Sequence, residues 1–139
     1  MDPVLPILDA LAGLGHEILL IAPRSLAEHL ERSTYAFRVA ADPPQDELKA
    51  IKQAIAEHRS DSGILSEREL FGRLSTEAML PTVEQAVTAW RPQLIVRETC
   101  EYAGALVAAR NGIRHAQVGI SLPSIDESAL SVAAEALER

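Results

Sequence analysis

The sequence predicts one α/β domain with a Rossmann-like, doubly wound and mostly parallel sheet. Short apolar runs alternate with amphipathic helical segments along the chain, which is typical of parallel strands joined by right-handed helical crossovers. No repeat or linker interrupts residues 1–139, a length that fits a single domain. The hydrophobic fraction of 47% and charged fraction of 24% exclude a disordered or fibrous chain.

The first half of the chain alternates helix and strand. Asp2 is placed as an N-cap before Pro3, and Gly15 is placed to end that first helix. Ser25 is the predicted cap of a second, short helix, and residues 41–47, with their paired prolines, predict a loop. The predicted helices are 3–14, 26–32 and 46–59, and the predicted strands are 17–22 and 36–40.

The second half begins with a long helical region. Ser66 and Glu69 match a capping box at its start, and Pro81 is predicted to kink or restart the helix, which continues to Trp90. The remaining predicted elements are a strand at 93–98, a helix from 102 that Gly112 ends, a strand at 115–120, a loop at 121–128, and a last helix capped by Ser124 or Asp126.

A parallel α/β domain usually opens with a central strand, whereas this chain opens on a helix. In the common strand order 3-2-1-4-5, the missing first strand would leave its neighbours, 17–22 and 93–98, about 9.6 Å apart with unpaired backbone groups. We therefore expect upstream or tag residues, a swapped neighbour or a different strand order to fill the central position.

The charge and hydropathy of the chain argue against two classes of partner. The formal charge of −7 argues against nucleic acid and anionic membrane surfaces, which would repel the protein. Every apolar run is much shorter than the roughly 18 residues of a membrane span, and the amino terminus lacks a basic region followed by an apolar one. We expect a cytoplasmic protein that binds small, neutral or weakly charged molecules.

The sequence predicts no metal site. Cys100 is the single cysteine, which excludes an internal disulfide and a multi-thiolate site, and we expect it to be a small buried side chain. The four histidines, His16, His29, His58 and His115, do not have a metal-ligand spacing. The glycines of "GLGHE" follow a helix rather than open one, so they do not form a phosphate-binding loop.

Two segments resemble a known family. "MDPVLPILDALAGLGHEILLIAP" (1–23) and "WRPQLIVRETCEYAGALVAARNGIRHAQVGISL" (90–122) are similar to the amino-terminal half of GT-B fold, UDP-glycosyltransferase-like (family 1 type) enzymes of actinobacterial natural-product pathways. Pro3 matches a motif proline, and Gly15 to Glu17 match the entry to the second strand. The resemblance implies a first strand before residue 1 and a carboxy-terminal nucleotide-sugar-binding domain after residue 139.

The resemblance also implies a mechanism. In the family, a histidine removes the proton of the acceptor hydroxyl, and a carboxylate after the fourth strand orients and charges that histidine. By position Glu98 matches this carboxylate, and it is the predicted catalytic residue. None of the four histidines matches the base, which the resemblance places just before Met1. The nucleotide sugar is a co-substrate, and no metal or other cofactor is implied.

Further residues are predicted to bind the acceptor: Asp2, Pro3, Phe71, Met79, Glu101 and Ser121. Phe71 and Met79 lie on helices that cover the acceptor cleft in the family, although their spacing with Leu74 suits a plain core equally well. Glu101 could serve as a helix cap instead.

The predicted function is that of the acceptor-binding domain of an inverting glycosyltransferase, which transfers a sugar from a nucleotide-sugar donor to a hydroxyl of an apolar natural-product aglycone. Its partner would be the nucleotide-sugar-binding carboxy-terminal domain, and the fragment alone would be inactive. Two alternatives remain open. One is a non-catalytic, stand-alone Rossmann-like binding or regulatory module whose sheet is completed by homodimerisation. The other is the acceptor half of a split glycosyltransferase.

Overall fold

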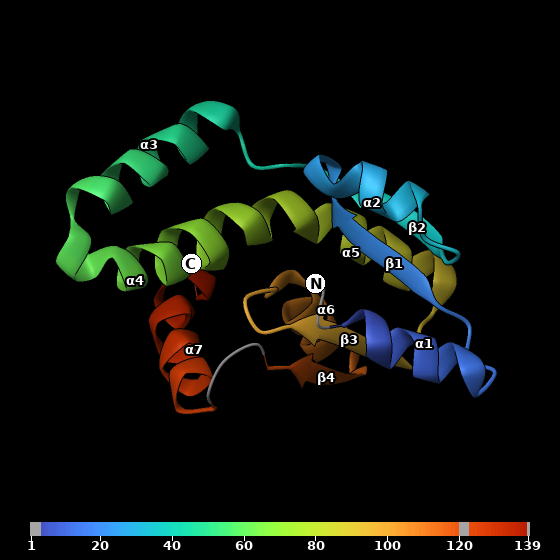
Figure 1. The fold of residues 1–139 in the computed structure, drawn as a ribbon. Coiled ribbons are helices and arrows are strands. Elements are labelled where there is room, and N and C mark those ends of the chain that lie inside the picture. The colour runs from blue at the N-terminus through green and yellow to red at the C-terminus, as the bar shows by residue number, and fades with distance from the viewer. Residues whose placement is uncertain (1–3, 120–122, 139) are drawn as a thin grey trace.

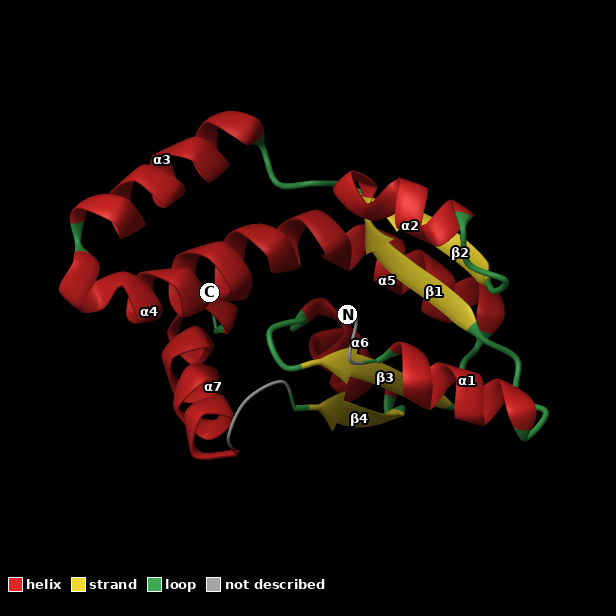
Figure 2. Cartoon of the chain, viewed as in Figure 1, coloured by secondary structure: helices red, strands yellow, loops and turns green. Residues whose placement is uncertain are grey.

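The computed structural model describes residues 4–119 and 123–138. It confirms the α/β class, since helices alternate with four parallel strands. The strands form two separate sheets (Figure 2). β1 (Leu19–Pro23) pairs with β2 (Ala36–Ala40), and β3 (Leu94–Glu98) pairs with β4 (Arg114–Val118).

The division falls where the sequence predicts a missing strand. The pairs β1–β2 and β3–β4 are what the order 3-2-1-4-5 leaves without its first strand. Within 4–119 and 123–138, neither β1 nor β3 pairs with a second strand. Among the described residues the strand order is therefore unchanged, and the alternative of a different strand order is wrong. Filling of the central position by upstream or tag residues or by a neighbouring chain stays a prediction.

A shared apolar core explains why the two sheets stay together. Its buried centre consists of Val83 and Val87 of α5 (Thr76–Trp90) with Ala103 and Val107 of α6 (Ala103–Asn111). Packed against this centre are Ile21 of β1, Ile95 of β3, Met79, Leu80 and Ile113. Both strand pairs thus rest on the same helices, and packing replaces the backbone pairing that is absent between them.

The amino-terminal elements follow the prediction closely. α1 (Leu5–Gly13) leads into β1, and β2 has the predicted bounds. Ser25 does not cap the second helix, because the chain first makes a 3-10 turn, η1 (Arg24–Leu26), before α2 (Ala27–Glu31). The Ser25 hydroxyl and backbone N–H instead donate to the Asp42 carboxylate, at 2.8 and 3.1 Å. The predicted cap Asp2 lies outside the described residues.

The middle of the chain is a long run of helix (Figure 1). It comprises α3 (Gln45–Glu57), η2 (Arg59–Asp61), α4 (Ser62–Leu65), η3 (Ser66–Ser75) and α5. η3 is a π-helix, with wider turns than an α-helix.

The predicted capping box is wrong, because α4 runs directly into η3 and the chain on both sides of Ser66 is helical. The Ser66 hydroxyl donates to the Ser62 carbonyl at 2.8 Å, while Glu69 accepts hydrogen bonds from Arg68 and Arg73. Pro81 lies inside a continuous α5, so it does not restart the helix. The irregular turns precede it, in η3.

The carboxy-terminal part is largely as predicted. Gly112 ends α6 with φ +64°, the left-handed conformation that glycine tolerates best. α7 (Pro123–Leu137) begins inside the predicted loop, so Ser124 and Asp126 lie within the helix and not before it. α7 packs across η3 (Figure 1). In the described part of the chain, no helix is long and apolar enough to cross a bilayer.

Gly72 makes the contact between η3 and α7 close. A Cβ at this position would lie 2.9 Å from the Glu67 carbonyl oxygen and 3.3 Å from the Ala133 Cβ. Both neighbours are held by helices and have little freedom to retreat. A side chain at 72 would therefore push the two helices apart.

We predict that Gly72→Ala lowers the free energy of unfolding by about 1–3 kcal/mol, the usual cost of overpacking. Thermal and urea unfolding would measure the change. Gly63→Ala is the matched control, because Gly63 is also helical and a Cβ there would meet nothing within 4 Å. The control is expected to be neutral or slightly stabilising. Equal effects of the two substitutions would contradict the proposed close packing.

Candidate functional site

The candidate site lies at the carboxyl end of β3. Glu98 is the last residue of this strand, and the loop 99–102 connects it to α6. In Figure 1, the arrowheads of β1 and β3 and the amino end of α1 lie toward the same side of the molecule. The carboxyl edge of a parallel sheet is where ligands bind in open α/β folds. Glu98 therefore occupies a position suited to function.

The Glu98 carboxylate is half-buried and has no hydrogen bond or ion pair with any described residue. Partial burial of a carboxylate costs free energy unless a hydrogen-bond donor or a cation pairs with it. If Glu98 served as a helix cap, its carboxylate would accept a hydrogen bond from a backbone N–H, as that of Glu101 does. The arrangement is thus that of an acidic group available to an incoming cationic or hydrogen-bond-donating group.

Arg97, the neighbouring residue, is buried with 6% of its surface exposed. Its Nη1 donates to the backbone carbonyls of Glu98, Thr99 and Glu101 at 3.0 to 3.1 Å. Its Nη2 donates to Gln117 Oε1 of β4 at 2.6 Å. The guanidinium therefore forms the centre around which the loop after β3 turns.

The remaining surroundings of Arg97 are aromatic and acidic. Its guanidinium carbon lies 6.0 Å from the centre of the Tyr102 ring, at the limit of a cation–π contact. The Nε atom is buried without a hydrogen-bond partner among the described residues. The charge of Arg97 also acts on the carboxylate of Glu101.

Glu101 caps α6. Both of its carboxylate oxygens lie 3.0 Å from the backbone nitrogen of Gly104, which donates to them at the first turn of the helix. Burial raises the pKa of this carboxyl above its ordinary value, while the hydrogen bonds from Gly104 and Ala103 and the charge of Arg97 oppose the rise. The structural role anticipated for Glu101 is confirmed, and its contact with an acceptor stays a prediction.

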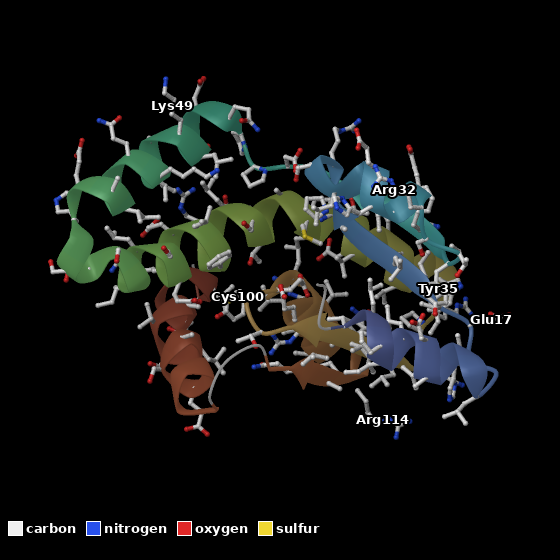
Figure 3. The ribbon with its side chains drawn as sticks, viewed as in Figure 1. Glu17, Arg32, Tyr35, Lys49, Cys100 and Arg114 are labelled. Carbon is white, nitrogen blue, oxygen red and sulfur yellow. The ribbon has the colours of Figure 1, made fainter. Side chains whose placement is uncertain are left out.

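Glu67 of η3 ties the loop to the long helical run. Its carboxylate accepts a hydrogen bond from the Tyr102 hydroxyl at 3.2 Å and from the Cys100 thiol at 3.6 Å. Figure 3 shows Cys100 in this loop, between β3 and the helical run. Burial, followed by the charge of Glu67, raises the pKa of Tyr102. Cys100 is half-buried and hydrogen-bonded, so the expectation of a small buried filler is wrong.

Of the other predicted acceptor residues, the structure describes Phe71 and Met79. Met79 packs against the core of α5 and α6, which favours the alternative of a plain core position. Phe71 is half-buried on η3, the helix that carries Glu67. Asp2, Pro3 and Ser121 lie outside the described residues.

No described histidine is placed to be the base. The side chains of His16, His29, His58 and His115 are all exposed, and none of them bonds to Glu98. A search of the described residues finds no group of three or more histidine, cysteine or acidic side chains able to hold a metal ion.

Arg97 and Glu67 are site residues that the sequence reasoning missed. Arg97 had a usable signal, since it is a charged residue that directly follows the apolar run "LIV" within a predicted strand, and such a residue needs partners when buried. Glu67 had none, because acidic residues near the start of a helical segment are ordinary. Only the fold brings it to the loop, from 35 positions away along the chain.

No protein-family model matches the chain. A curated relative, aklavinone 7-beta-L-rhodosaminyltransferase of Streptomyces galilaeus, is 24% identical over 140 residues, which covers 86% of this chain and 31% of the relative.

Solved structures give a fuller match. SsfS6, a glycosyltransferase of Streptomyces sp. SF2575, superposes with a TM-score of 0.75 at 23% identity, over 98% of this chain and 41% of its own. The chain has the fold of part of a glycosyltransferase. The complex of SsfS6 with thymidine diphosphate has a TM-score of 0.67 at 23% identity, covering 98% of this chain and 40% of its own. The glycotransferase of kitacinnamycin has a TM-score of 0.61 at 16% identity, covering 99% and 32%.

The predicted fold, a Rossmann-like part of a GT-B glycosyltransferase, is thereby confirmed. The chain spans about a third of the length of its curated relative and about two fifths of SsfS6. The matched part contains both blocks on which the resemblance rested, since nearly the whole chain is covered.

The raised pKa of Glu101 predicts a dependence of stability on pH. A carboxyl whose pKa is higher in the folded state binds its proton more tightly there, so its contribution to stability is greatest below the unfolded pKa. That contribution is lost as the pH rises through the folded pKa. Glu101→Gln has no such titration and keeps an acceptor oxygen for Gly104.

We therefore expect Glu101→Gln to gain stability relative to the natural chain as the pH rises from 4 to 7, as measured by urea unfolding at several pH values. A relative stability that moves in the opposite direction over this range would show that ionisation of Glu101 favours the fold.

Proposed function

We propose that the chain is the acceptor-binding part of a glycosyltransferase that transfers a sugar from a nucleotide-sugar donor to a hydroxyl of a natural-product aglycone, with inversion at the anomeric carbon. The observation that carries the proposal is the half-buried Glu98 carboxylate at the carboxyl end of β3, which has no hydrogen bond or ion pair with any residue that the structure describes. It lies in a fold shared with SsfS6. The curated relative supports the same reaction class by its name.

The chemistry assigns Glu98 an indirect role. An alcohol is a weak nucleophile until a positioned base removes its proton, and imidazole is the usual base near neutral pH. Glu98 would hold this imidazole in the orientation that accepts the proton and would stabilise the imidazolium that forms. The exposed histidines at 16, 29, 58 and 115 do not suit this role, so the proposal takes the imidazole from outside the described residues.

The donor is proposed to bind mainly to another part of the protein. The formal charge of −7 disfavours a diphosphate. The glycines with a left-handed backbone conformation in the described residues, Gly15 and Gly112, follow helices and do not open one. The thymidine diphosphate complex of SsfS6 belongs to a protein of which this chain matches 40%. A nucleotide-sugar-binding domain is therefore the proposed partner.

The acceptor is proposed to be an apolar aglycone held between the loop after β3 and η3. Glu67 fastens these two segments through Tyr102 and Cys100. η3 also carries Phe71, a half-buried aromatic side chain. Small-molecule sites combine mainly apolar side chains with a few polar groups, and Phe71 and Glu98 would supply one of each kind.

We predict that Glu98→Gln lowers kcat for sugar transfer by about tenfold or more, because a neutral amide stabilises an imidazolium poorly. The assay would use the whole gene product with aklavinone and thymidine-diphosphate-linked sugars, and would follow the glycosylated product by mass spectrometry.

Glu17→Gln is the matched control. Glu17 is an exposed carboxylate that Figure 3 places far from Cys100 and the loop after β3, and its substitution is expected to leave kcat unchanged. An unchanged kcat for Glu98→Gln would return Glu98 to a structural role. A gene product that binds aklavinone in calorimetry but never consumes a donor would favour the non-catalytic module.

A further inference from the structure

We propose that Arg97 is a positioning residue that sets the direction of the Glu98 carboxylate by holding the backbone of the loop that follows it. The inference rests on the proposed function of Glu98. Its basis is the convergence of the carbonyls of residues 98, 99 and 101 on one nitrogen of a buried guanidinium, at 3.0 to 3.1 Å.

Strand geometry keeps the two neighbours apart. Successive side chains of a β-strand point to opposite faces, so Arg97 and Glu98 project in opposite directions from the end of β3. Arg97 consequently binds the main-chain carbonyl of Glu98 without forming an ion pair with its carboxylate. The carboxylate stays available to another group while its backbone is held.

A second contact anchors the same guanidinium to the neighbouring strand. Gln117 lies directly opposite Arg97 in the β3–β4 register, and its Oε1 accepts from Nη2 at 2.6 Å. The loop itself is joined to the end of β4, because the Thr99 hydroxyl donates to the Val118 carbonyl at 3.2 Å. Arg97 thus holds the loop carbonyls and is itself held by β4, which fixes the position of the loop relative to the sheet.

The chemistry of this position favours arginine. Three carbonyls on one side and an amide oxygen on the other need several donors in one plane, which a guanidinium supplies and a lysine ammonium does not. A buried cation is also costly unless its hydrogen bonds are met. Here the loop carbonyls satisfy Nη1 and Gln117 satisfies Nη2, while Nε has no partner among the described residues. The position of the charge and the path of the loop therefore depend on each other.

The test is a double-substitution cycle in the whole gene product, with aklavinone and the thymidine-diphosphate-linked sugar that gives transfer. Arg97→Lys is expected to lower kcat about tenfold or more, the order of effect of misplacing a reacting group, with little change in KM for the aglycone. In the Glu98→Gln background the same substitution is expected to cost less than about twofold, because residues that act as a unit are not additive.

Two further variants complete the design. Gln117→Leu removes the hydrogen-bond partner of Nη2 at an exposed position of β4. This variant tests the role of Arg97 even if Arg97→Lys does not fold. It is expected to lower kcat in the same non-additive way. Arg110→Lys is the matched control, since Arg110 is an exposed arginine of α6 paired with Glu84, and its kcat is expected to be unchanged.

The outcomes separate this inference from the proposed function. If Glu98→Gln lowers kcat but the losses from Arg97→Lys and Glu98→Gln simply multiply, Arg97 is a structural residue and the inference is overturned while the function stands. An unaltered kcat for Glu98→Gln overturns the role of Glu98 and this inference with it.

A crystal structure of the Arg97→Lys or Gln117→Leu protein tests the positioning role of Arg97 without an assay of sugar transfer. The inference requires the backbone of residues 98–101 to shift and the Glu98 carboxylate to move by about 1 Å or more, the scale of displacement that matters for reactivity. An unchanged loop and carboxylate in both variants would overturn it, whether or not sugar transfer is observed.

Discussion

The packing of α5 and α6 against both strand pairs is the interaction on which the rest of the structure depends. Ile21 of β1 and Ile95 of β3 contact the same buried centre, which Val83 and Val107 help to form. Fully burying one aliphatic side chain stabilises by about 1.5–3 kcal/mol, whereas one backbone hydrogen bond contributes a net of about 0.5–1.5 kcal/mol. A few such side chains are therefore enough to hold two sheets between which the described residues form no strand pairing, and they fix the carboxyl end of β3 relative to the core.

The candidate site is built outward from that support. β3 ends on Glu98, the buried Arg97 turns the following loop, and Glu101 starts α6 by accepting the N–H of Gly104. A Cβ at Gly104 would lie 2.5 Å from a Glu101 carboxylate oxygen and 3.3 Å from Ile95, so a side chain there would displace the capping carboxylate. Glu67 then connects the loop to η3. Each contact serves folding, and together they leave the Glu98 carboxylate without a partner among residues 4–119 and 123–138, at the edge where parallel sheets bind ligands.

Much of this arrangement was predictable from the sequence. The apolar runs placed all four strands, Gly112 placed the end of α6, and the position of Glu98 at the end of a strand was correct. The errors came from rules of local capping. Ser25 and Ser66 bond to other partners because the chain around them was already helical or tightly turned, which short motifs do not reveal. Arg97 and Glu67 acquire their roles from distant partners, so their importance depends on tertiary structure.

The π-helical form of η3 has a consequence for how the protein tolerates changes in length. Residues of an α-helix follow one another by about 100° around the axis, and a π-helix accommodates extra chain within the same span. Deleting one residue between Ser66 and Ser75 would let the segment tighten to α-helical turns. The helix surface upstream would then rotate, carrying the carboxylate of Glu67 away from Tyr102. Insertions and deletions are usually tolerated in surface loops. In η3, by contrast, the number of residues in the helix determines which side chain contacts the loop after β3.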